Sequence, residues 1–144
     1  MRKLAIGKGR QVRAGQDVAV LSLGHVGNYA LQAAERLAAE GINMAVYDMR
    51  FAKPLDEELL HEVLRQFKYI ITLEDGCLMG GFGSAVVEFM ADQGYHNRAK
   101  RLGIPDEVIE HGTQLELHRQ CGFDPEGIYQ AALALLEAKP AAVK

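Results

Sequence analysis

Residues 73–84, which read LEDGCLMGGFGS, decide how the rest of this 144-residue chain can fold. They overlap the β-branched and aromatic run 69–73, YIITL, which predicts a buried strand. They lead into residues 85–90, AVVEFM, which predict a helix. Acidic residues therefore lie at the end of a strand, ahead of a glycine-rich turn and a helix N-terminus. In an open α/β sheet this edge is where ligands or neighbouring domains bind.

The glycines of this turn are expected to serve its backbone. Gly80, Gly81 and Gly83 leave the backbone free to adopt positive φ angles, and they allow another backbone or a phosphate to come close. The helix that follows is expected over about 84–93, closed by Gly94. What this turn contacts is the main functional question that the sequence poses.

The composition is that of a single soluble globular domain, with 49% hydrophobic and 24% charged residues. A net charge of -3 gives no reason to expect a nucleic acid or an anionic membrane as partner. The apolar runs are shorter than the roughly 20 residues of a spanning helix, and the N-terminus lacks the apolar core of a secretory signal. Cys77 and Cys121 lack CxxC spacing, so we expect free thiols and a cytoplasmic location.

Strand and helix patterns alternate along the chain. Residues 18–23 form a continuous apolar run, residues 26–38 repeat apolar positions at helical spacing before Gly41, and residues 44–49 predict another strand. The remaining predicted elements are a helix from Asp56 to near Phe67, the strand 69–73, the helix 84–93, a weaker edge strand at 98–102, a short helix around 114–120 and a helix that begins at Asp124 and Pro125. The sequence thus predicts an α/β fold in three layers, with a mostly parallel five-stranded sheet and helices on both faces.

The chain divides into three predicted parts. Residues 1–17 form a linker with one short edge strand at 11–13, residues 18–138 form the domain, and residues 139–144 form a flexible tail.

Several residues are candidates for chemistry. Glu74 and Asp75 could take part in acid/base work or hold a metal, but no histidine or second acidic pair lies nearby at ligand spacing, which favours hydrogen bonding or capping. His111 stands in a predicted loop beside Gly112, where catalysis and an interdomain hydrogen bond are both open. His25 follows the strand 18–23 and by topology reaches the same sheet edge as the acidic pair.

A phosphate site at the glycine turn is the less favoured interpretation. Gly81 and Gly83 supply GxG without the final glycine of a dinucleotide fingerprint, and no Walker lysine precedes Ser84. A tight turn that packs against a neighbouring domain is favoured, and a free-standing anion- or nucleotide-binding module is kept as the alternative. From the residues alone we assign no catalytic, cofactor-binding or metal-binding position within the chain.

Two quoted stretches carry a family resemblance. Residues 48–56, DMRFAKPLD, followed by residues 74–85, EDGCLMGGFGSA, resemble the C-terminal domain of transketolase-like thiamine diphosphate enzymes. Residues 101–106, RLGIPD, and 109–112, IEHG, narrow the resemblance to the 1-deoxy-D-xylulose-5-phosphate synthase family, and IGKGR at 6–10 is similar to its link into the third domain. The resemblance covers essentially the whole chain. Asp75 departs from it, since a second glutamate is expected there.

The resemblance implies a function for the enzyme of which this domain would be part. That enzyme condenses pyruvate with D-glyceraldehyde 3-phosphate, releases carbon dioxide and feeds isoprenoid, thiamine and pyridoxal synthesis. Its thiamine diphosphate and magnesium belong to the first two domains, whose GDG…N motif is absent here. The chain is then expected to be the excised third domain, inert and without cofactor on its own, and its family suggests an antiparallel edge strand. A natural split subunit is the other possibility.

The resemblance also implies partners, namely the upstream domains of the same enzyme and a dimer mate. An apolar surface around Leu78, Met79 and Phe82 would give weak self-association in isolation. The residues expected at the interdomain surface are Glu74, Asp75, Gly80, Gly81, Phe82, Gly83 and His111, with His25 and Gly112 as weaker candidates.

Overall fold

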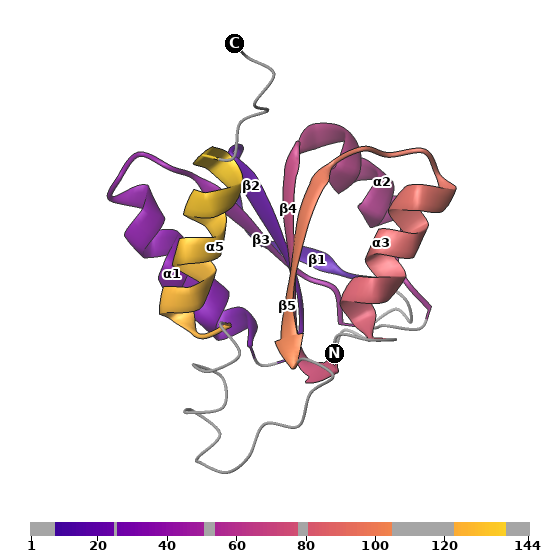
Figure 1. The fold of residues 1–144 in the computed structure, drawn as a ribbon, viewed down its shortest axis with the longest axis horizontal. Helices are drawn as coiled ribbons and strands as arrows, with labels where there is room; N and C mark the ends of the chain where they lie inside the picture. Colours follow the sequence, from indigo (N-terminus) through magenta and orange to yellow (C-terminus); the bar gives the residue numbers. More distant parts are fainter. Residues whose placement is uncertain (1–7, 25, 51–53, 78–80, 105–122, 138–144) are drawn as a thin grey trace, which may run out of the picture.

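The computed structural model describes residues 8–24, 26–50, 54–77, 81–104 and 123–137 (Figure 1). In chain order the elements are β1 (Arg10–Arg13), β2 (Val18–Leu23), α1 (Gly27–Ala38), β3 (Met44–Asp48), α2 (Glu57–Gln66), β4 (Tyr69–Cys77), α3 (Phe82–Asp92), β5 (Arg98–Ile104) and α5 (Pro125–Glu137). The predicted helix around 114–120 and the tail 139–144 lie outside the described residues. Within the described ranges no helix is both long and apolar enough to cross a membrane.

The five strands form one sheet in the order β1-β3-β2-β4-β5. Every neighbouring pair is parallel except β1 and β3, which are antiparallel. The predicted mostly parallel five-stranded sheet with an antiparallel edge strand is therefore confirmed. The chain turns to opposite sides of β2 to form β3 and β4, so the topological switch point lies at the carboxyl ends of β2 and β4.

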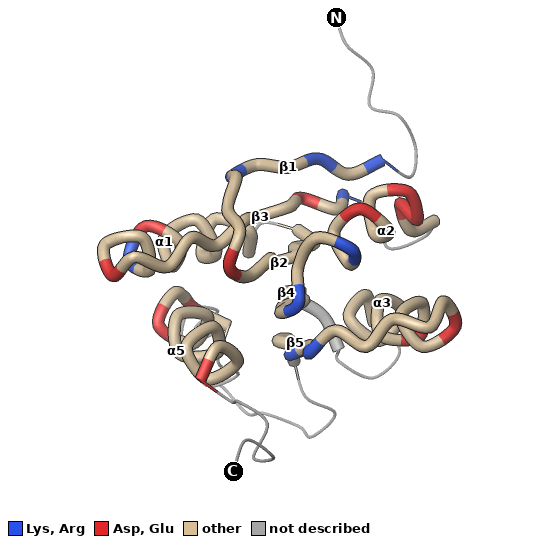
Figure 2. Tube along the Cα trace, turned by 90° about the horizontal axis from the view of Figure 1, so that it is seen from above, with Lys and Arg blue, Asp and Glu red and all other residues tan. Residues whose placement is uncertain are grey.

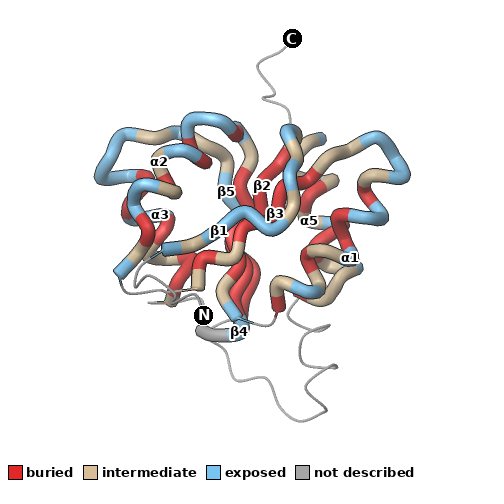
Figure 3. The backbone as a smooth tube through the Cα atoms, turned by 180° about the vertical axis from the view of Figure 1, so that it is seen from behind, coloured by how far each residue is buried: buried red, intermediate tan, exposed pale blue. Residues whose placement is uncertain are grey.

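Helices cover both faces of the sheet. Viewed from above, α1 and α5 lie on one side of the strands and α2 and α3 on the other (Figure 2). Alternate residues of β2 serve the two layers, because successive side chains of a strand point to opposite faces. Val18 and Val20 belong to the core under α1 and α5, whereas Ala19 and Leu21 belong to the core under α2 and α3. The inner strands are buried while much of β1 is exposed (Figure 3).

The predicted helix boundaries follow from side chains and glycines at the ends. Asp56 accepts a hydrogen bond from Leu59 N at 3.1 Å and thereby caps α2. Asp124 accepts from Gly127 N at 2.9 Å, just ahead of Pro125, as expected for the start of α5. At the other end, α1 is followed by Gly41 with a φ of 82°.

Three boundaries differ from the sequence prediction. β4 continues to Cys77 instead of ending at 73, and α3 begins at Phe82, two residues before the expected start. The earlier start of α3 is explained by the side chain of Glu74, which joins the strand to the helix as described below, and β4 reaches Cys77 because that residue pairs with Ile104 of β5. β5 continues to Ile104 instead of ending at 102. The short edge strand predicted at 11–13 is present as β1, which pairs with β3 over a bulge between Gln11 and Arg13.

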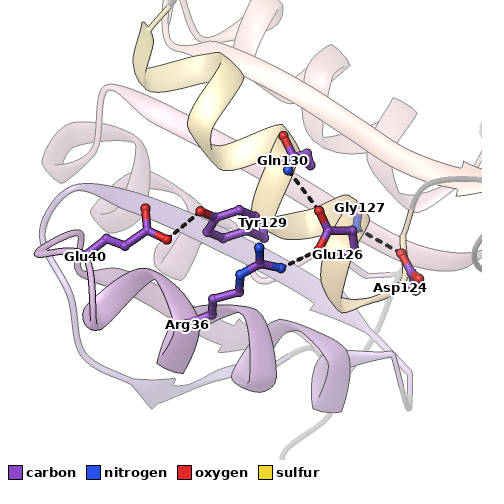
Figure 4. Close-up of polar contacts among 7 residues, drawn as sticks. All are labelled: Arg36, Glu40, Asp124, Glu126, Gly127, Tyr129 and Gln130. Atoms are coloured by element: carbon purple, nitrogen blue, oxygen red, sulfur yellow. Dashed lines mark hydrogen bonds and ion pairs between the residues drawn. The ribbon is translucent and has the colours of Figure 1, made fainter.

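A set of polar contacts, which we call the α1–α5 clasp, fastens the last helix to the first (Figure 4). The guanidinium of Arg36 lies 3.7 Å from the centroid of the Tyr129 ring and forms an ion pair with Glu126. The hydroxyl of Tyr129 donates to the carboxylate of Glu40. These contacts join residues about ninety positions apart in the sequence. They surround the buried Ile128, which anchors α5 in the core.

Glu126 makes the clasp dependent on pH. Hydrogen bonds from Gln130 and then from Arg36 hold the pKa of the Glu126 carboxyl below its ordinary value of 4.5. A carboxyl with a lowered pKa contributes stability above its ordinary pKa, and that contribution is lost as the pH falls through the lowered value. We expect Glu126→Gln to reduce the free energy of unfolding at pH 7, with the difference from wild type shrinking below pH 4.5.

Urea unfolding followed by circular dichroism at several pH values measures this difference. The control is Glu137→Gln, a neutralisation on the same helix outside the clasp. A difference that stays constant from neutral to acidic pH would show that the Glu126 charge does not stabilise the clasp.

Candidate functional site

The candidate site is built at the carboxyl end of β4, beside the switch point of the sheet. Glu74 is the last residue of β4 in register with β2, where it lies opposite Leu23. The pairing of β4 with β5 becomes irregular between Leu73 and Cys77. The acidic pair therefore stands where regular pairing ends on both sides of the strand, as the sequence predicts.

Glu74 closes the strand onto the following helix. Its Oε1 atom accepts from Phe82 N at 2.8 Å, and its Oε2 atom accepts from Gly83 N at 2.7 Å. Only 4% of the Glu74 surface is exposed. Because the first N–H groups of a helix have no intrahelical acceptor and carry partial positive charge, a carboxylate here satisfies two donors at once. We call this arrangement the Glu74 cap, and it supports the predicted capping role of Glu74.

A glycine is required at position 83 because other side chains come close to its Cα atom, and not because of its backbone angle. A Cβ atom at Gly83 would lie 2.6 Å from Thr72 Oγ1 and 3.1 Å from Glu74 Oε2. Neither this glycine nor Gly81, which has a φ of -90°, uses the freedom to adopt positive φ that glycine gives the backbone. At Gly83 the groups that come close are thus side chains, chiefly those of the preceding strand.

The remaining predicted site residues differ in what the structure describes. Asp75 is exposed and lies two residues before the end of β4. Phe82 was expected to contribute exposed apolar surface, and this prediction is wrong because its side chain is only 2% exposed in the core under α2 and α3. Gly80, His111, His25 and Gly112 lie outside the described residues, as do Leu78 and Met79. The predicted clustering of His25 with the acidic pair stays a prediction.

Two neighbours of the cap were missed by sequence reasoning. Thr72 is fully buried on the same face of β4 as Glu74, and its Oγ1 has no hydrogen-bond partner. Arg101 of β5, which lies opposite Thr72 in the sheet register, donates from Nη1 to Ser84 Oγ at 2.9 Å. The pairing of β5 with β4 places Arg101 there, and no local sequence pattern reports it.

The chemistry of this edge is structural. The two N–H groups that would receive a phosphate are bound by Glu74, and its negative charge would repel an anion. Across the described ranges, no group of three or more His, Cys, Asp or Glu side chains lies close enough to hold a metal ion. The arrangement joins the strand at Glu74 to the first residues of α3.

Comparison with known families agrees with this architecture. Residues 7–128 match the family described as transketolase, C-terminal domain. The chain belongs to this family of α/β domains.

The curated relatives are much longer than this chain. It is 60% identical over 126 residues to 1-deoxy-D-xylulose-5-phosphate synthase of Cytophaga hutchinsonii, which covers 88% of the chain and 20% of that protein. It is 50% identical over 131 residues to the protein of the same name in Bacteroides fragilis, again covering 20% of the relative. The chain thus spans about a fifth of the length of these relatives.

Solved structures share the fold. One, described as a split gene transketolase in an inactive beta4 tetramer, superposes with a TM-score of 0.88 at 32% identity and covers 96% of this chain and 45% of that chain. A transketolase mutant from Pichia stipitis superposes with a TM-score of 0.66 at 19% identity, covering 92% of this chain and 19% of that chain, and supports the fold alone.

The Glu74 cap can be tested by removing its acceptors. Glu74→Ala leaves two buried N–H groups unpaired and should lower the free energy of unfolding by about 2–4 kcal/mol, while Glu74→Gln keeps one acceptor and should lower it less. Amide hydrogen exchange at Phe82 and Gly83 should accelerate in the same order. Glu88→Gln, at an exposed position of α3, is the control, and equal effects at both positions would contradict the cap.

A second test concerns the close approach at Gly83. Gly83→Ala should lower the free energy of unfolding by about 1–3 kcal/mol, because the new methyl group meets Thr72 Oγ1. Thr72→Ala removes that atom, so adding Gly83→Ala in the Thr72→Ala background should be milder, whereas Thr72→Val keeps the crowding. Strictly additive effects in the Thr72→Ala background, measured by urea unfolding, would exclude the contact as the cause.

Proposed function

We propose that this chain is the C-terminal, third domain of a thiamine diphosphate-dependent 1-deoxy-D-xylulose-5-phosphate synthase. The observation that carries the proposal is the 60% identity over 126 residues to a protein of that name, of which the chain matches only 20%. The enzyme would condense pyruvate with D-glyceraldehyde 3-phosphate and release carbon dioxide. The family resemblance places this reaction in isoprenoid and thiamine biosynthesis, and we propose a cytoplasmic location.

The role of this domain in the enzyme would be assembly. The one deeply buried carboxylate among the predicted site residues, Glu74, is committed to the helix N-terminus and is not open to a substrate. The edge around it, with Asp75 and Gly81, would dock against the upstream domains and the dimer mate. Weak self-association of the isolated chain remains part of the proposal, although Phe82 does not contribute exposed surface to it.

The cofactors would belong to the other domains. The described residues of this chain do not fit a diphosphate–magnesium site, because the N-terminus of α3 is bound by Glu74 and no described group of carboxylate, imidazole or thiol side chains has the arrangement of a metal site. Thiamine diphosphate and Mg²⁺ would be held by the upstream domains of the full-length enzyme.

A natural split subunit is a second candidate that one observation favours. The solved structure described as an inactive beta4 tetramer of a split gene transketolase is 32% identical and superposes closely. In that case the same docking surface would bind a separate partner chain. The gene decides between the two candidates: a continuous upstream reading frame supports the third domain, and a separate gene that encodes GDG…N supports the split subunit.

Complementation tests the assembly role. The chain is mixed with the separately expressed upstream domains, thiamine diphosphate and Mg²⁺, and carbon dioxide release from pyruvate with D-glyceraldehyde 3-phosphate is followed. Activity should require both pieces. Glu74→Ala should weaken complementation, whereas Asp92→Asn, an exposed change at the end of α3, should leave it unchanged.

Two results would contradict the proposal. Activity of the isolated chain would end the idea of an inert domain. A folded mixture that associates but has no activity would remove the synthase assignment and leave only the fold.

A further inference from the structure

A cavity at the carboxyl ends of β2 and β3 is distinct from the Glu74 cap, which lies at β4. It has a volume of about 140 Å³ and is partly open to solvent. An engineered protein cavity of roughly 150 Å³ holds benzene, so this cavity has room for a ligand of about six or more heavy atoms. It lies between the edge strand β1, the ends of β2 and β3, and the first turn of α1. Its lining residues are Arg10, Val12, Ser22, Gly24, Gly27, Asn28, Leu31, Val46 and Asp48.

The charges of the cavity come from two strands that face each other. Arg10 of β1 lies directly opposite Asp48 of β3 in the antiparallel register, so both side chains project from the same face. That face is the α1 side, because Val46, two residues before Asp48, belongs to the core under α1. Within the described residues no ion pair joins Arg10 to Asp48. A positive and a negative group therefore line one cavity with no ion pair between them.

The polar atoms of the cavity divide into acceptors and donors. Ser22 Oγ, on a residue only 2% exposed, donates its single proton to the carbonyl oxygen of Tyr47 at 3.0 Å, so toward the cavity it can only accept. The Asp48 carboxylate also only accepts, and it uses Oδ1 for Arg50 N at 3.1 Å. Arg10, with five N–H groups, only donates.

Gly27 keeps the Ser22 hydroxyl oxygen, one of the acceptors of the cavity, accessible. A Cβ atom at this position would lie 2.9 Å from Ser22 Oγ, and the next nearest atom, Ser22 Cβ, would lie 3.7 Å away. The absence of a side chain leaves the hydroxyl oxygen open to the cavity. The first turn of α1 contains no acidic residue, so no side chain of that turn competes with an anionic group near Arg10.

We propose that this cavity binds a small aliphatic α-amino acid as its zwitterion. The ammonium group, with three N–H donors, suits Asp48 and Ser22, which can only accept. The carboxylate suits the forked guanidinium of Arg10. Val12, Leu31 and Val46 supply an apolar wall for a short aliphatic side chain. A phosphate or other simple anion suits the cavity less well, because Asp48 would repel it. The inference does not depend on the proposed enzyme function.

Ligand analogues test the proposal on the wild-type chain. The 144-residue chain labelled with ¹⁵N is titrated with L-valine, with isovalerate, which lacks the ammonium group, and with isobutylamine, which lacks the carboxylate. L-valine should give saturable shifts at the amides of Ser22, Gly27 and Asn28, and each analogue should bind about tenfold more weakly or worse, because each loses a charged hydrogen-bonding group.

Matched variants assign the binding to the cavity. Arg10→Met and Asp48→Asn should each weaken L-valine binding about tenfold or more, whereas the neutralisations Arg65→Met on α2 and Asp92→Asn on α3 should not change it. Equal binding of isovalerate and L-valine would replace the proposal with an anion site. Absence of saturable shifts with L-valine, or shifts that Arg10→Met and Asp48→Asn leave unchanged, would overturn it. Should a variant fail to fold, the analogue series on the wild-type chain still decides.

Discussion

The bond between Glu74 and the start of α3 is the interaction on which the candidate functional edge depends. In a parallel sheet the chain passes from a strand into a helix at the carboxyl edge, where the first N–H groups of that helix lack partners. Here the strand itself supplies the acceptor. A buried carboxylate binds Phe82 N and Gly83 N, so the glycine-rich turn is held at both ends. The same bond explains why α3 begins earlier than its sequence pattern indicates.

Because Glu74 is used for these structural hydrogen bonds, its carboxylate is not open for chemistry on a ligand. A buried carboxylate at a sheet edge would be a strong candidate for acid/base work if it were open to a ligand. Both of its oxygens instead satisfy backbone donors, with Gly83 held close to Thr72 on the other side. A rigid edge of this kind suits docking within a larger enzyme, since docking needs a fixed shape and not a free reactive group.

The charges of the domain are distributed by layer. Both edge strands carry basic residues, namely Arg10 and Arg13 on β1 and Arg98, Lys100 and Arg101 on β5, and acidic residues lie on all four helices (Figure 2). Basic side chains on edge strands discourage pairing of one sheet with another copy of itself. The β1 edge also supplies Arg10 to the cavity above α1, where its neighbour across the sheet is Asp48. The strand that protects the edge therefore also lines the second candidate site.

The sequence by itself determined the α/β architecture, the capping roles of Asp56 and Asp124, and the acidic residue ahead of a glycine turn. These features are local: hydrophobic period, capping residues and glycine positions act within a few residues of one another. The tertiary structure decided the rest. The α1–α5 clasp joins residues about ninety positions apart, and the facing of Arg10 and Asp48 depends on strand pairing. Phe82 was misjudged because its burial is set by the helix layer that covers it, which no local pattern contains.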